Sequence, residues 1–163
     1  MILMFRKPET GNPNPEPVAF MPYQSFESLD VWKRASRLAV RVYKELRNCR
    51  DYGLKDQMTR AGVSIASNIA EGYERGSNKD FIRFLNIAKG SAAELRTQLY
   101  IAEQIDVIEM EKRKELVTET IVISRMLQKL ADSRRDQVRE DDEIPNPDIL
   151  NLISTIDAPE IPE

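Results

Sequence analysis

The sequence predicts an all-α protein that folds as an up-down antiparallel four-helix bundle. All nine prolines, the residues that most strongly break helix interiors, lie outside residues 23–144. Within this range, four stretches repeat apolar residues at steps of three or four, as amphipathic helices do. The breaks between the stretches are short, which places successive helices antiparallel. The bundle is therefore predicted over residues 23–135, between a disordered or extended proline-rich arm at 1–22 and an acidic tail at 136–163.

Each of the four stretches carries one apolar stripe. In residues 29–48 the stripe consists of Trp32, Ala35, Ala39, Val42 and Leu46, and it extends to Cys49 just beyond. In residues 54–73 it consists of Leu54, Met58, Ala61, Ile65, Ile69 and Gly72. The third and most regular stripe consists of Phe81, Leu85, Ala88, Ala92, Leu95, Leu99 and Ala102. The fourth consists of Leu116, Thr120, Ile123, Leu127 and Leu130.

Polar residues and a glycine mark where the helices are expected to begin and end. Ser77, with Asp80 three positions later, is typical of the start of the third helix. Asp106 and Glu109 have the same spacing and predict the start of the fourth. Gly53 is predicted to separate the first helix from the second.

The composition excludes several classes of site. Among 163 residues there are 24 Lys and Arg, 27 Asp and Glu, one Cys and no His. A His-based triad and a Cys/His zinc site are therefore impossible, and one cysteine cannot close an intramolecular disulfide. No nucleophile–base pair or metal-ligand set is visible, so we predict a non-enzymatic protein without cofactor or metal. No apolar run approaches the ~20 residues that span a bilayer, so we expect a cytoplasmic protein with no membrane partner.

Charge divides along the same boundaries as proline. Residues 23–135 hold 21 basic and 16 acidic side chains, whereas residues 136–163 hold one basic and nine acidic. The basic residues are concentrated on the first helix, as Lys33, Arg34, Arg37, Arg41, Lys44 and Arg47. A ridge of one sign can follow a phosphate backbone, which predicts salt-dependent binding of RNA or another nucleic acid. The alternative is an ordinary solvated helix face.

Two helices are apolar on more than one face. The second is small or apolar nearly all round between residues 61 and 70. The third carries further apolar residues outside its stripe, namely Ile82, Phe84, Ile87, Tyr100 and Ile101. Such helices are covered on more than one side, which favours self-association over a wider intramolecular core. Residues 90–93, Gly-Ser-Ala-Ala, predict close packing of the third helix against the second.

Four polar residues fall among the helical core positions: Arg60, Asn68, Glu71 and Glu94. Two carboxylates on facing helices are able to act as general acid and base, but the di-iron bundle pattern needs Glu-x-x-His twice and this chain lacks His. We therefore interpret the four residues as a hydrogen-bonded polar core that sets helix register.

The tail contains one further helix signal, near residues 147–156. Asn146 is a good cap, and Pro147 suits the first helical position. An apolar face follows, formed by Ile149, Leu150, Leu152, Ile153 and Ile156. This short amphipathic helix either docks to a partner or neighbouring subunit, or folds back on its own bundle.

Several of these segments resemble a known family. They are Leu-Asp-Val-Trp at 29–32, Arg-Ala-Gly-Val-Ser-Ile-Ala-Ser-Asn-Ile-Ala-Glu-Gly at 60–72, and Phe-Ile-Arg-Phe-Leu-Asn-Ile-Ala-Lys-Gly-Ser at 81–91, followed by Glu-Leu at 94–95. They are similar to the bacterial four-helix-bundle proteins encoded within intervening sequences of 23S ribosomal RNA genes, most specifically in residues 67–72. The accessory variability determinant of diversity-generating retroelements is similar in fold. The chain departs from the family at Ala66, where members usually have proline, and in its arm and tail.

The resemblance covers roughly residues 23–130 and implies a ring-like homopentamer. For the retroelement members it also implies a basic surface that binds RNA and a reverse transcriptase. Together with the basic first helix, this predicts a non-enzymatic oligomer that binds RNA, as an accessory subunit of a reverse transcriptase. The alternative is a protein-interaction scaffold whose C-terminal segment docks to a partner or a neighbouring subunit.

Overall fold

A computed structural model describes residues 25–143 of the chain. A 3₁₀ turn, η1 (Phe26–Ser28), precedes four helices: α1 (Asp30–Glu45), α2 (Tyr52–Glu74), α3 (Asn78–Gln104) and α4 (Met110–Glu143). Residues 25–143 contain no strand. The predicted arm at 1–22 and the predicted helix near 147–156 lie outside the described residues.

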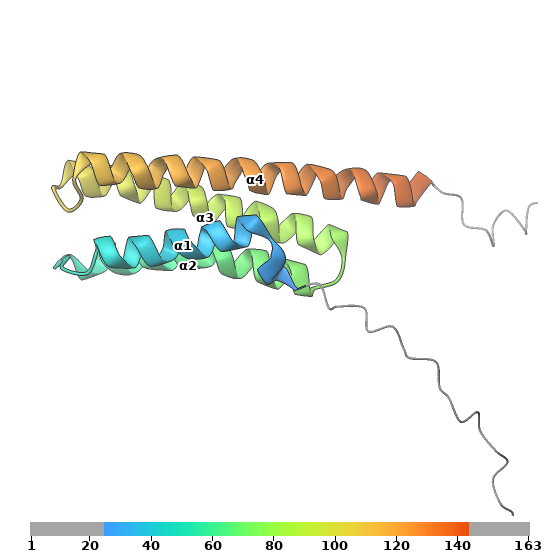
Figure 1. Ribbon diagram of the computed structural model, residues 1–163, viewed down its shortest axis with the longest axis horizontal. Helices are drawn as coiled ribbons and strands as arrows, with labels where there is room; N and C mark the ends of the chain where they lie inside the picture. Colours follow the sequence, from blue (N-terminus) through green and yellow to red (C-terminus); the bar gives the residue numbers. More distant parts are fainter. Residues whose placement is uncertain (1–24, 144–163) are drawn as a thin grey trace, which may run out of the picture.

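The helices form the predicted up-down antiparallel four-helix bundle (Figure 1). Helices α1 and α3 each pack against both α2 and α4. Within the described residues, no backbone contact joins the diagonal pairs, α1 with α3 and α2 with α4. Each helix thus has two neighbours and one face left for solvent, and α4 projects past the other helices at its C-terminal end (Figure 1).

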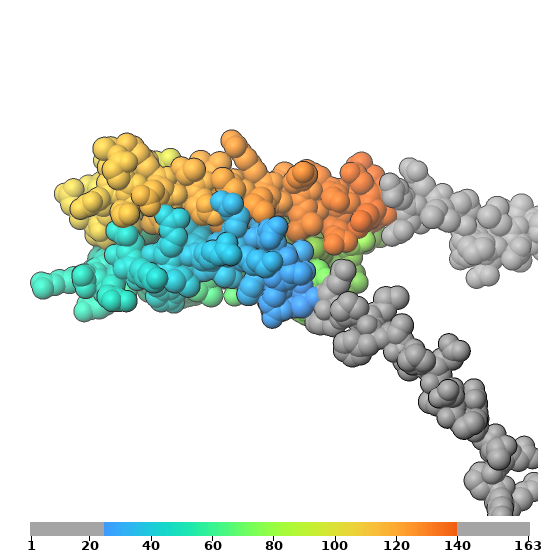
Figure 2. All heavy atoms as spheres, in the orientation of Figure 1, coloured from blue at the N-terminus to red at the C-terminus, as the bar shows by residue number. Residues whose placement is uncertain are grey.

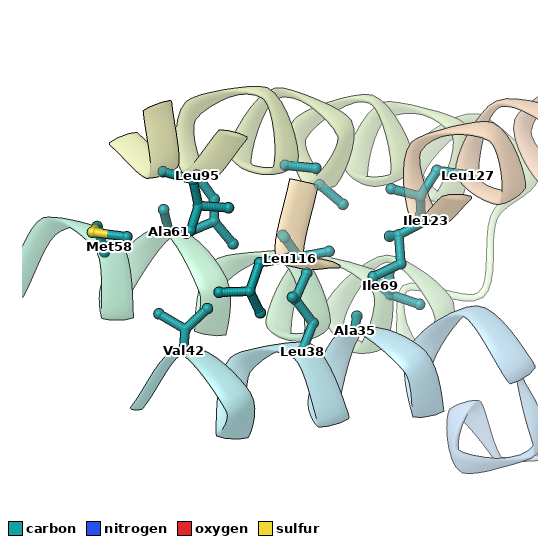
Figure 3. Close-up of a cluster of buried hydrophobic side chains, with 14 of the residues drawn as sticks. Ala35, Leu38, Val42, Met58, Ala61, Ile69, Leu95, Leu116, Ile123 and Leu127 are labelled. Carbon is teal, nitrogen blue, oxygen red and sulfur yellow. The ribbon is translucent and has the colours of Figure 1, made fainter. Parts of the chain in front are cut away.

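The four predicted stripes meet in one core (Figure 3). Its fully buried members come from all four helices and include Leu38, Met58, Ile65, Leu95, Leu99, Ile123 and Leu127. Burying each such side chain contributes about 1.5–3 kcal/mol. Trp32, Cys49, Leu54 and Leu130 lie at the edge of the core, half-buried against it. The helical periodicity therefore identified the core correctly.

Helix α2 packs closely against its neighbours at two of its glycines, and residues 90–93 pack against it through Ser91 but not through Gly90. A Cβ at Gly62 would lie 3.5 Å from Ala39 Cα, and a Cβ at Gly72 would lie 2.5 Å from Phe84 Cβ. The prediction for Gly90 is wrong, because this residue is exposed and a Cβ there would meet nothing within 4 Å. Since successive helix residues point about 100° apart, the core face of α3 passes through the neighbouring Ser91 and Ala92 instead.

The predicted N-terminal signals are correct for α3 but not for α4. Ser77 Oγ accepts a hydrogen bond from the Asp80 amide at 3.0 Å, which caps α3. Helix α4 begins at Met110 rather than at Asp106. Asp106 instead has a left-handed backbone with a φ of 59°, and it forms the turn that ends α3.

Two helix boundaries also differ from the predicted ones. Asp51 Oδ1 accepts from the Leu54 amide at 3.0 Å, so α2 begins at Tyr52 and Gly53 lies inside its first turn. Helix α4 continues to Glu143, past the predicted bundle end at residue 135, because no proline interrupts it before residue 145.

The extra apolar residues of α3 divide between the two predicted explanations. Phe84 is buried against α2 at Gly72, and Ile82 is half-buried, so part of the set belongs to a wider intramolecular core. Three others, Ile87, Tyr100 and Ile101, remain between 42% and 48% exposed.

Candidate nucleic-acid interface

The bundle divides the predicted basic ridge of α1 into paired and unpaired cations. Arg34 belongs to the paired group, because its Nε and Nη2 donate to the two carboxylate oxygens of Glu119 on α4, at 2.8 and 2.7 Å. The Glu119 side chain is only 19% exposed. Its hydrogen bonds and its charge raise the pKa of Arg34 further above its ordinary value. Arg34 therefore ties α1 to α4.

Two other ridge residues also have partners. Arg41 Nη2 lies 2.9 Å from Glu115 Oε2 on α4. Lys33 lies 3.6 Å from Asp30 and donates to the Ser28 carbonyl at 3.2 Å. Figure 2 shows the face on which α1, in blue and cyan, lies beside α4, in yellow and orange. The acids of α4 thus neutralise the edge of α1 that adjoins it.

The remaining predicted residues, Arg37, Lys44 and Arg47, are exposed, and their side chains form no ion pair within residues 25–143. Lys55 of α2 joins them, since its Nζ donates to the Arg47 carbonyl at 3.2 Å. We call Arg37, Lys44, Arg47 and Lys55 the cation patch. Lys55 was missed from the sequence because its position depends on how α2 packs against α1, and no local pattern signals that.

The cation patch surrounds two adjoining hollows. One, of about 400 Å³, is lined by Val40, Tyr43, Lys44, Arg47 and Lys55. The other, of about 350 Å³, is lined by Ser36, Arg37, Val40, Arg41 and Lys44. Because Val40 and Lys44 line both, the hollows form one continuous depression along the outer side of α1.

The predicted polar core is wrong for three of its four members. Arg60, with 80% of its side chain exposed, pairs with Asp56 one turn away at 3.6 Å. Glu71 is exposed and accepts from Arg75 at 2.7 Å, and Glu94 is exposed and accepts from Gln98 at 3.2 Å. Each side chain bonds within its own helix, so none of the three sets the register between helices.

Asn68 does belong to a polar contact between α2 and α3. Its Nδ2 donates to the carbonyl and to Oγ of Ser64, at 2.7 and 3.0 Å. Ser64 Oγ lies 2.9 Å from Ser91 Oγ on α3. The hydroxyls and the amide hydrogen-bond to one another, so this cluster links α2 to α3, and among residues 25–143 no carboxylate or amine hydrogen-bonds to either serine hydroxyl.

A second structural link ties α3 to α4. Arg113 Nε and Nη2 donate to Glu103 at 2.7 and 3.0 Å, and both side chains are only 17% exposed. The Arg113 hydrogen bonds lower the pKa of Glu103. The arginine also lies over the Tyr100 ring, 5.1 Å from its centroid. Arg113 and Glu103 therefore neutralise each other, and neither charge is left for a ligand.

Comparison with known proteins now assigns the chain. The family model described as 23S rRNA-intervening sequence protein matches residues 27–129, from η1 through most of α4. The chain belongs to the 23S rRNA-intervening sequence protein family.

Among solved structures, this family member is similar to a protein of unknown function from the S23 ribosomal protein family of Bacteroides thetaiotaomicron. The two are 30% identical with a TM-score of 0.59, and the match covers 62% of this chain and 97% of the other. No curated protein matches the chain. The whole cation patch lies inside the family match, whereas the predicted docking residues Ile149, Leu150, Leu152, Ile153 and Ile156 lie outside the described residues.

Two further findings bear on this 23S rRNA-intervening sequence protein. Over the described part of the chain, no helix is both long and apolar enough to cross a membrane. Within the same residues, no group of three or more Cys, Asp or Glu side chains is placed to hold a metal ion.

Proposed function

We propose that this protein is a non-enzymatic RNA-binding bundle that holds phosphates on the cation patch of α1 and α2. The observation that carries the proposal is the separation of cations on α1. Arg34 and Arg41 are paired with acids of α4, whereas Arg37, Lys44 and, in the turn after α1, Arg47 are exposed and form no ion pair within residues 25–143. The family's name connects its members with 23S rRNA, which supports RNA as the nucleic acid.

The physical basis is counterion release. Each cation that neutralises a phosphate displaces a condensed counterion, so the logarithm of the binding constant falls with the logarithm of salt concentration. The slope is about −0.7 per phosphate contact for a single strand. Cations already held by Glu115 and Glu119 displace fewer counterions, so the cation patch is expected to dominate the salt dependence.

The test compares two triple variants of equal charge. The first replaces Arg37, Lys44 and Arg47 by glutamine. The control replaces Lys79, Arg125 and Arg139 by glutamine, three exposed cations of α3 and α4 that likewise form no ion pair within residues 25–143 and line none of the described hollows and grooves. RNA binding is measured over a salt series by fluorescence anisotropy, with circular dichroism to verify folding.

We expect the first variant to bind more weakly and its salt slope to become shallower by about 2. The control is expected to retain most of the slope, although its net charge changes equally. Equal losses in both variants would mean that RNA senses only overall charge, and an unchanged first variant would contradict the proposal outright.

We also propose that the functional unit is a homo-oligomer, a pentamer according to the family resemblance. Support comes from apolar surface on opposite parts of the bundle. On α3 and at its C-terminal cap, Ile87, Ile101 and Ile105 are 42–49% exposed. Between α1 and α2 lies a shallow groove of about 340 Å³, lined mainly by small and apolar residues that include Trp32, Val63 and Ala66. Two different surfaces of this kind suit a head-to-tail ring.

Light scattering on the RNA-binding samples should give a multiple of the 18.8 kDa chain mass, and a monomer would contradict the proposed oligomer.

A second candidate function is protein interaction through the C-terminal segment. An open groove of about 450 Å³ lies between α1 and α4, lined by apolar Leu29, Val31, Met126 and Leu130 and by polar Asp30, Lys129 and Ser133. The apolar residues at 149–156 would pack on the apolar side chains of this groove on a neighbouring copy. Deleting residues 144–163 would then reduce the number of subunits in the oligomer. The retroelement resemblance adds a reverse transcriptase as the proposed heterologous partner, to be tested by co-purification.

A further inference from the structure

An aromatic side chain lies inside the cation patch. Tyr43 and Val40 are each 52% exposed, although α1 buries its other valines and its one leucine. Both line the same hollow as Lys44, Arg47 and Lys55. An exposed ring surrounded by unpaired cations offers a ligand two kinds of contact, a flat apolar face and positive charge.

The Tyr43 ring also has no aromatic or cationic partner among residues 25–143. Tyr73 packs edge-on against Phe81 at 5.7 Å, and Tyr100 is covered by Arg113. Among the described residues, no ring or cation contacts the face of Tyr43. Its face therefore remains available for a ligand.

From this arrangement we infer that the cation patch takes single-stranded RNA in preference to duplex, with one base stacked on Tyr43. The inference rests on the proposed function and names the class of RNA. In a duplex the bases stack on one another, and a side chain on a helix surface meets only backbone and groove edges. An unpaired base exposes its π-face, and aromatic rings beside cations are the usual platform for it.

Other occupants explain fewer of these features. An acidic peptide would use Lys44, Arg47 and Lys55 but has no use for the bare ring. A second copy of the chain that presented the same patch would bring like charges together, which disfavours association. A single strand engages both features, with phosphates on the cations and a base on Tyr43. Because α1 rises about 1.5 Å per residue, Arg37 and Lys44 lie about 10 Å apart along the axis, so the patch spans only a few nucleotides.

The test uses the full chain and two probes of equal length, an oligo(U) strand and an RNA duplex, each of about 12 nucleotides per strand. The variants are Tyr43→Ala and Tyr43→Phe. The matched control is Tyr52→Ala, because Tyr52 is 76% exposed, likewise has no described ring contact, and lines neither hollow. Affinity is measured over a salt series, with mass measured on the same samples.

We expect Tyr43→Ala to weaken oligo(U) binding about tenfold while duplex binding changes less than about twofold. Its salt slope should stay that of the parent, because no phosphate contact is lost. Tyr43→Phe keeps the ring and should bind as the parent does, and so should Tyr52→Ala.

Three results would overturn the inference. Unchanged oligo(U) binding by Tyr43→Ala would remove the stacking role. An equal loss for strand and duplex would make Tyr43 a support for the patch rather than a platform. A change in oligomer mass would show that a second copy covers the ring. If the triple variant at Arg37, Lys44 and Arg47 binds RNA more weakly than the parent, the proposed function survives any of these outcomes. If that variant also binds normally, both fail.

Discussion

Two glycines, Gly72 in α2 and Gly90 in α3, should respond oppositely to the same substitution. Replacing a helical glycine by alanine lowers the entropy of the unfolded chain and stabilises the helix by about 1 kcal/mol. At Gly90 the new Cβ meets nothing within 4 Å, so this gain is expected in full. Gly90→Ala should therefore raise the free energy of unfolding by about 1 kcal/mol.

At Gly72 a steric cost opposes the same gain. The new Cβ would lie 2.5 Å from Phe84 Cβ and 3.2 Å from Phe81 Cδ2. A Cβ is bonded to the backbone and cannot rotate away, so α3 itself must shift from α2. Overpacking of this kind costs about 3 kcal/mol at the upper end of its usual range. Gly72→Ala should therefore lower the free energy of unfolding by about 2 kcal/mol, and the two variants should differ by about 3.

Urea unfolding followed by far-UV circular dichroism measures both values against the parent, at two protein concentrations. The reasoning would be refuted if Gly72→Ala were as stable as the parent, because the close approach of α2 and α3 would then not constrain the bundle. A loss of stability in Gly90→Ala would also refute the reasoning, because it would mean that a Cβ at residue 90 clashes with a neighbouring atom.

Two further predictions concern the ion pairs. Because Arg113 lowers the pKa of Glu103, the stabilisation that this carboxylate provides is complete above its ordinary pKa of about 4.3 and is lost as the pH falls through the lower folded value. Glu103→Gln should therefore be less stable than the parent at pH 7, and the difference should close as the pH falls below the ordinary pKa of glutamate in urea titrations; a difference that stayed constant on acidification would contradict this. Arg41→Gln removes an exposed pair and should change the free energy of unfolding by no more than about 0.5 kcal/mol, whereas Arg34→Gln should cost more because it leaves half-buried Glu119 without both hydrogen bonds. Thermal unfolding of the two variants gives the order, and an equal or reversed order would contradict it.

The helices and the core were predictable because they depend on periodicity, which is local. An apolar residue every three or four positions determines which side of a helix is buried, whatever the helix packs against. This is why the third stripe, from Phe81 to Ala102, is buried throughout. The predicted start of the fourth helix was wrong. Asp106 and Glu109 have the spacing of a cap, but the backbone at Asp106 is left-handed, so the helix begins only at Met110.

The candidate site was only partly predictable, because which charges are available depends on the neighbouring helix. The sequence does not distinguish Arg34 from Arg37. In the fold, however, Arg34 pairs with Glu119, 85 positions away in the chain, whereas Arg37 forms no ion pair within residues 25–143. The same reasoning explains the polar core. Arg60 and Glu71 lie near core positions in sequence, but about 100° of rotation per residue places them on the outer face of α2.

The position of the acids on α4 therefore determines which cations of α1 remain unpaired and available to the proposed RNA ligand. Glu115 and Glu119 draw Arg34 and Arg41 towards α4 and neutralise that edge. The charge left over is displaced towards α2, where Lys55 adds to it and where Tyr43 and Val40 are exposed. If the acids faced another helix, Arg34 and Arg41 would also be free of partners, and the cations of α1 would form one continuous ridge. The ion pairs that hold α1 to α4 thus confine the unpaired charge of this region to the side of α1 that carries its exposed ring, Tyr43.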